Sequence, residues 1–140
     1  MPGLPLAEKL ALLLGPDAAL RRLMAAALTD AGATLVDDPE RAHYLVACGA
    51  SVPLSPSPCW ESVLLIAAAD TSPEAAALPA LARYWALRLA PRVRVNALLL
   101  GPNAENAAGN ATGIAATAIY LLAAAHFTTG ATLRLDDRML

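Results

Sequence analysis

The stretch RVRVNALLLGP, residues 92–102, decides the fold of this chain. Val93 and Val95, followed by the apolar run 97–100, predict a buried β-strand, and the Gly-Pro pair after them predicts a turn. One polar residue, Asn96, interrupts the strand. Because a buried amide requires hydrogen-bond partners, we expect Asn96 to have a structural role inherited with the fold.

Strand and helix patterns alternate on both sides of this stretch. Strands are predicted at 9–15, 34–36, 43–47, 62–68, 93–100 and 131–136, helices at 16–33, 72–89 and 112–127, and loops at 48–60 and 103–111. Unbroken apolar strands that alternate with helices indicate a parallel sheet covered on both faces. The sequence therefore predicts one α/β domain over residues 1–140, with a doubly wound, mostly parallel, Rossmann-like sheet of about six strands.

The composition favours burial of some surface against another chain. Hydrophobic residues make up 57% of the sequence and charged residues 16%, which leaves little polar material to cover a surface, although much of the apolar content is alanine. The net charge of −2 disfavours nucleic acid as a partner, because phosphate binding needs a basic stripe. The most apolar helical run, 114–125, is too short to span a bilayer.

The cysteines and histidines do not suggest a metal site or a disulfide framework. Cys48 and Cys59 lack a metal-ligand spacing, and His43 and His126 are far apart in the chain. We expect both cysteines to be small buried hydrophobic residues in a reducing compartment, the cytoplasm or an organelle matrix. Four arginines cluster at 83, 88, 92 and 94, and we expect them to be solvated or in an interface rather than in a phosphate site.

Two blocks of sequence resemble the short-chain dehydrogenase/reductase superfamily, and particularly its pteridine reductase branch. Residues 80–102 are similar to the long helix and following strand of that family, and residues 118–140 to its closing helix and strand. In the tail, Thr129, Gly130 and Asp136 match the family's pattern, whereas Asp137 and Arg138 replace two glycines. The resemblance implies a fold built for NAD(P)-dependent hydride transfer.

The resemblance implies a longer chain than this one, so we expect at least one helix and one strand of the nucleotide-binding half to be missing. We expect their loss to leave an apolar sheet face uncovered.

The catalytic residues that the resemblance implies are missing from this sequence. The family uses a tyrosine and a lysine four residues later, but the only lysine here is Lys9. Tyr84 and Arg88 have that spacing, yet alignment on Asn96 puts the family's tyrosine near residues 70–71. Residues 67–69, where the family's catalytic serine is expected, are all alanine.

The cofactor loop that the resemblance implies is only partly retained. Gly15 matches the first glycine of the family's TGxxxGxG pattern, but Ala19 and Arg21 replace the other two, and Asp17 adds a negative charge. Arg21 could pair with a phosphate, and Asp37 could hold a ribose hydroxyl. Gly15, Arg21 and Asp37 are therefore weak candidate contacts to NAD or NADP, and we expect no bound cofactor.

The leading functional hypothesis is a non-catalytic reductase-like subunit, or pseudoenzyme, that acts in the assembly or stabilisation of a homo- or hetero-oligomer. In the family, oligomers form through the long helix and the closing helix and strand. The predicted interface residues are Tyr84, Trp85, Arg88, Tyr120 and Phe127. The alternative is that the aromatic residues only pack the core. The partner would be a second copy, a full-length reductase paralogue or a larger complex.

Two other hypotheses remain. One is an NAD(P)H-dependent pteridine-type reductase whose site is completed by a partner chain. The other is a module that senses a nucleotide without turning it over.

Overall fold

A computed structural model describes residues 4–49, 56–68, 73–101 and 108–135 and shows a six-stranded sheet in which all strand pairs are parallel. The strand order is β2-β1-β3-β4-β5-β6. The strands are β1 (Leu10–Leu14), β2 (Thr34–Leu35), β3 (Tyr44–Cys48), β4 (Ser62–Ala68), β5 (Arg94–Leu100) and β6 (Thr132–Leu135). The predicted α/β, doubly wound, Rossmann-like class with about six strands is confirmed.

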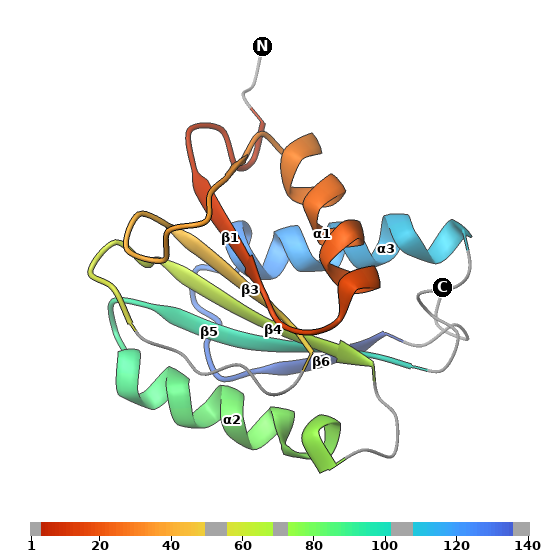
Figure 1. Cartoon of the computed structure of the whole chain (residues 1–140). Coiled ribbons are helices and arrows are strands. Elements are labelled where there is room, and N and C mark those ends of the chain that lie inside the picture. Colours follow the sequence, from red (N-terminus) through yellow and green to blue (C-terminus); the bar gives the residue numbers. More distant parts are fainter. Residues whose placement is uncertain (1–3, 50–55, 69–72, 102–107, 136–140) are drawn as a thin grey trace.

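Helices cover both faces of the sheet (Figure 1). They are α1 (Ala18–Asp30), α2 (Pro73–Leu89), α3 (Ala108–Ile119) and the π-helix η2 (Tyr120–Ala124). Helices α1, α3 and η2 pack on one face around Met24, Leu98 and Ile114, and α2 packs on the other around Leu65, Leu78 and Val95. The central strands are therefore buried on both sides, as their unbroken apolar sequences predict.

The start and end of α1 follow the sequence signals. The Asp17 carboxylate accepts a hydrogen bond from the Leu20 amide at 3.1 Å and caps the first turn. Gly32, just after the helix, has a φ of 104°, a conformation that glycine adopts without the strain that a Cβ causes.

The C-terminal helical segment differs from the prediction in its start and in its geometry. Helix α3 begins at Ala108, four residues before the predicted start at 112, and its last turn is the π-helix η2. The Arg94 guanidinium donates hydrogen bonds to the carbonyls of Leu122 and Ala125, at 2.9 and 2.7 Å. The expectation that Arg94 is a solvated or interface residue was wrong, because its side chain satisfies carbonyls that the end of a helix leaves free.

Asn96 joins β5 to the turn that precedes β6. Its side chain is 1% exposed, its amide group donates to the carbonyl of Thr128 at 2.9 Å, and its oxygen accepts from the amide of Ala131 at 3.0 Å. The Thr129 hydroxyl accepts a further hydrogen bond from the amide of Val95. The predicted structural role of Asn96 is confirmed, since both polar ends of a buried side chain are satisfied.

The apolar sheet face that we expected to be uncovered is covered. Leu12, Leu45 and Ala47 are at most 4% exposed, and Trp60, itself 2% exposed, belongs to the same core cluster. The Trp60 indole donates a hydrogen bond to the carbonyl of Pro39 at 2.9 Å. The expectation failed because a large aromatic side chain from a loop can bury as much apolar surface as part of a helix.

Replacing Asn96 with alanine is expected to destabilise the protein by about 2 kcal/mol, because the change breaks two buried hydrogen bonds and leaves backbone groups without partners. Chemical denaturation of the wild type and the variant measures this difference. Thr112→Ala, an exposed change in α3, is the control and is expected to shift stability by less than about 0.5 kcal/mol. Equal stabilities for the two variants would contradict the role of Asn96.

Candidate functional site

The carboxyl end of β1 and the start of α1 form the place where the sequence predicts cofactor contacts. Gly15 has a φ of 106°, and a Cβ on it would lie 2.1 Å from the carbonyl oxygen of Cys48. The Asp17 amide donates to that same carbonyl at 3.1 Å. Gly15 is therefore required for the close approach of β1 to the end of β3, which is a contact within the chain itself.

A negatively charged side chain, the Asp17 carboxylate, already occupies the first turn of α1. The Leu20 amide, one of the free N–H groups that a phosphate would use at a helix start, donates to the Asp17 carboxylate. Ala19 and Arg21, at the other two glycine positions of the family pattern, are both exposed on this turn. The donors and the charge at this helix start therefore do not match those that a pyrophosphate needs.

Asp37 follows β2, whose pairing with β1 ends several residues before Gly15. The last hydrogen bond between β2 and β1 runs from the Val36 amide to the carbonyl of Ala11 at 2.9 Å, whereas β1 continues to Leu14. Asp37 is exposed, and the next residue, Asp38, accepts a hydrogen bond from the Glu40 amide in a local turn. The structure thus brings Gly15 and Arg21 to one helix start but shows no contact of Asp37 with them.

Cys48 is the last residue of β3. The residue is buried, and burial raises the pKa of its thiol to about 12, with a further increase from the charge of Asp17 and a decrease from Arg21. The prediction that Cys48 is a small buried hydrophobic residue is confirmed. A thiol with this pKa stays protonated near neutral pH and is neither a nucleophile nor a metal ligand.

The described residues at the carboxyl end of β4 carry no proton donor. Ala67 and Ala68 are the last residues of the strand, and Ala67 is 5% exposed. Residues 70–71, where the alignment puts the family's tyrosine, lie outside the described residues. Tyr84 and Arg88 lie near the C-terminal end of α2, where the Arg88 guanidinium is 5.3 Å from the centre of the Tyr84 ring. This pair is at the far end of α2 from the carboxyl edge of the sheet.

The amino ends of the strands hold a polar cluster that the sequence analysis missed. Lys9 and Glu61 form an ion pair of 2.9 Å, and the Lys9 ammonium lies 6.0 Å from the centre of the Tyr44 ring. Burial raises the pKa of Tyr44, and the charge of Glu61 adds to the increase. A tyrosine near a lysine therefore exists in this chain, but its phenol is not activated and it lies at the edge opposite Gly15.

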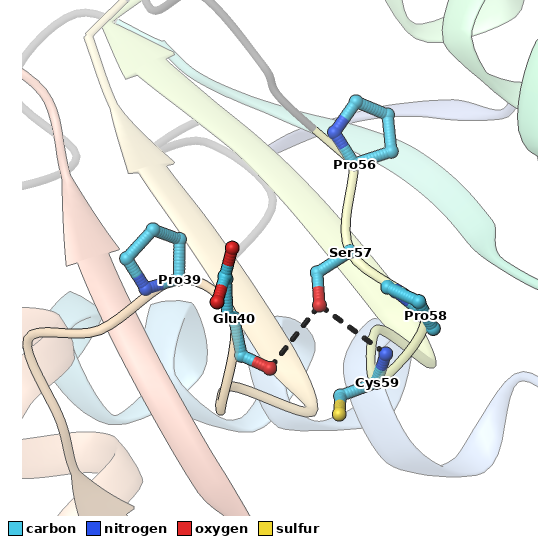
Figure 2. Close-up of a pocket in the computed structure, with 6 residues that line it drawn as sticks. All are labelled: Pro39, Glu40, Pro56, Ser57, Pro58 and Cys59. Atoms are coloured by element: carbon cyan, nitrogen blue, oxygen red, sulfur yellow. Dashed lines mark hydrogen bonds between the residues drawn. The ribbon is translucent and has the colours of Figure 1, made fainter.

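A pocket of about 480 Å³ lies between two loops (Figure 2). It is lined by Pro39, Glu40, Pro56, Ser57, Pro58 and Cys59. The buried Ser57 hydroxyl donates to the carbonyl of Glu40 at 3.1 Å and accepts from the amide of Cys59. Cys59 is exposed, so the prediction that it is buried was wrong, because the proline-rich loop turns its side chain away from the sheet.

The predicted interface residues lie on both layers of helices. Tyr84 and Tyr120 are 51% and 53% exposed and Phe127 is fully exposed. Trp85 is partly buried against the core under α2 and meets the Tyr84 ring edge to face at 5.4 Å. Tyr84, Trp85 and Arg88 therefore form one cluster on α2, whereas Tyr120 starts η2 in the layer on the opposite face of the sheet (Figure 1).

Several solved structures have the same architecture. A short-chain dehydrogenase/reductase of Serratia marcescens superposes with a TM-score of 0.71 at 18% identity, over 94% of this chain and 97% of that chain. The enoyl-[acyl-carrier-protein] reductase (NADH) of Aquifex aeolicus gives 0.72 at 17% identity over 99% of each chain. This chain has the short-chain dehydrogenase/reductase fold.

The ligand-free aldohexose dehydrogenase of Thermoplasma acidophilum has the same fold, with a TM-score of 0.68 at 13% identity over 96% of this chain and 95% of that one. No protein-family model and no curated protein sequence matches this chain. The resemblance to short-chain dehydrogenases/reductases is thus confirmed in the fold, and the pteridine reductase branch stays a prediction. None of the helices in the described ranges is long and apolar enough to cross a membrane.

The two cysteines are expected to differ sharply in reactivity. At about pH 8, iodoacetamide should alkylate exposed Cys59 and leave Cys48 unmodified in the folded protein, while both should react in denaturant. Peptide mass mapping measures each site. Because folding raises the pKa of Cys48 from 9.0 to about 12, the folded state binds that proton more tightly, and its stability should fall as the pH rises above 9.0.

Cys48→Ala removes this contribution to the pH dependence, and Cys59→Ala is the matched control that keeps it. Alkylation of Cys48 as fast as Cys59 in the folded protein would show that the end of β3 is open to solvent.

Proposed function

We propose that this protein is a non-catalytic, reductase-like subunit whose role is the assembly or stabilisation of a protein complex. The single observation that carries the proposal is the Asp17 carboxylate on the Leu20 amide, at the helix start where a dinucleotide phosphate would bind. A second anion there would meet a negative charge and an amide that is already engaged.

The residues at the carboxyl ends of β3 and β4 support the same proposal. Ala67 and Ala68 end β4 without a hydroxyl, and the thiol of Cys48 is held protonated by burial. Hydride transfer to or from a carbonyl needs a group that moves a proton to or from the oxygen. The described residues at the carboxyl ends of β3 and β4 supply no such group.

The exposed aromatic residues support a role in protein contact. Phe127 is fully exposed and Tyr84 and Tyr120 are about half exposed, and exposed aromatic side chains are enriched in interfaces. We assign the interface to the two predicted regions, the end of α2 and the segment from η2 to β6.

Titration with NADPH and with NADH is expected to show no saturable change in cofactor fluorescence and no rise in melting temperature. A ligand that binds only the folded state stabilises it by about 2.7 kcal/mol at a hundred times its Kd, so even moderate affinity would be visible in the melting temperature. Saturable binding would overturn the assembly role in favour of a nucleotide sensor, and oxidation of NADPH in the presence of a pterin would overturn the non-catalytic assignment in favour of a reductase.

The exposed aromatic residues are expected to contribute little to folding. Phe127→Ser and Tyr120→Ser should each change the free energy of unfolding by less than about 0.5 kcal/mol. Leu121→Ala, a change of the neighbouring residue, which is 2% exposed, is the contrasting control and should cost about 2–5 kcal/mol. A comparable loss in all three variants would mean that the aromatic residues serve the core and not an interface.

A further inference from the structure

The outer surface of α2 combines exposed apolar side chains with arginines. Tyr84 is 51% exposed and Leu87 is 82% exposed. Arg83 and Arg88 are also exposed, and at 100° per residue all four side chains share one arc of the helix, with the arginines at its two edges. We call these four residues the α2 face.

A groove runs beside the α2 face. It has a volume of about 230 Å³ and is lined by Arg83, Ala86, Leu87, Thr129 and Gly130. It therefore lies between α2 and the turn that leads into β6. Arg134 of β6 pairs in register with Leu99, whose side chain packs on the α2 side of the sheet, so exposed Arg134 points to the same side of the molecule.

Acidic residues are fewer than arginines from the start of α2 to the end of β6. From residue 73 to residue 135 the chain has five arginines, at 83, 88, 92, 94 and 134, and two acidic residues, Glu74 in the first turn of α2 and Glu105, which lies outside the described residues. Only Arg94 is engaged by backbone carbonyls of η2, while the other four are exposed. The overall net charge of −2 therefore conceals a local excess of positive charge around α2.

This charge pattern opposes pairing of two copies through the α2 face. In a twofold antiparallel contact centred on Tyr84 and Leu87, residue 83 of each copy lies opposite residue 88 of the other, so arginine meets arginine. In a parallel contact each arginine lies opposite the same arginine of the second copy. Like charges at a contact cost free energy and act against wrong partners, and no carboxylate of the described part of α2 lies between Tyr84 and Arg88 to separate them.

We infer that the α2 face binds a different protein chain that presents carboxylates around an apolar side chain. Such a partner would cover Tyr84 and Leu87 and pair with the arginines at both edges. The Tyr84 ring already lies against the Arg88 guanidinium, which orders that arginine before binding. This inference rests on the proposed assembly function and specifies its partner as an acidic chain.

The oligomeric state tests the charge argument without the partner. Light scattering is expected to find the wild type monomeric and Arg83→Glu dimeric, because the variant places glutamate opposite Arg88 of a second copy. The dimer should dissociate in high salt, and Arg83→Glu/Arg88→Glu should be monomeric again. Arg22→Glu, at an exposed position on α1, is the matched control and should stay monomeric.

A peptide probe tests the partner's chemistry. A fluorescent helical peptide of glutamate and leucine should bind the wild type, and Arg83→Glu/Arg88→Glu should weaken binding about tenfold or more. A counterpart with lysine in place of each glutamate should not bind. No binding of the acidic peptide, equal binding of the lysine peptide, or tighter binding of a single-stranded oligonucleotide would each overturn the inference.

The two proposals fail in different ways. A wild-type dimer that Tyr84→Ser dissociates would overturn the acidic partner and leave assembly standing with a second copy as the partner. Saturable NADPH binding would overturn the proposed function in favour of a nucleotide sensor and leave the charge of the α2 face unaffected.

Discussion

The hydrogen bonds of Asn96 hold the C-terminal part of this fold together. Strand β6 is an edge strand of four residues that pairs only with β5. Asn96 ties the turn before β6 to the middle of β5, and Arg94, two residues earlier on β5, binds the end of η2. Two polar side chains of one buried strand thereby position the last helix, the turn and the last strand.

Residues with local signals were predicted correctly, and residues that depend on distant contacts were not. The strands, the caps of α1 and the role of Asn96 follow from periodicity and from the cost of an unsatisfied amide. Trp60 joins the core cluster of Leu12 and Leu45 from a loop, and the polar composition of 103–111 concealed the early start of α3. The exposure of Cys59 and the role of Arg94 depend on long-range packing in the same way.

The candidate site was predictable in its residues but not in its geometry. The sequence identified Gly15 as a match to the family's pattern, Asp17 as an added negative charge and Cys48 as a small buried residue. Only the structure shows that these three residues meet, with the Cys48 carbonyl against Gly15 and the Asp17 amide on that carbonyl. The contact closes the end of β1 against β3 and leaves Asp17 to cap α1 from within the chain. A helix start capped in this way gains stability from its own sequence and loses one of the free N–H groups that make such ends bind anions.

Capping the helix start internally and exposing an arginine-edged face on α2 concern opposite ends of the molecule, yet both agree with the proposed function. A subunit that binds no cofactor would need neither glycines nor proton donors at the carboxyl edge, and Asp17 there stabilises the start of α1 as its cap. An exposed Leu87 and an exposed Phe127 carry an aggregation risk with no benefit to folding, which a role in protein contact would explain. The arginines beside Tyr84 and Leu87 limit that risk, since they repel a second copy and leave the apolar pair available to an acidic chain.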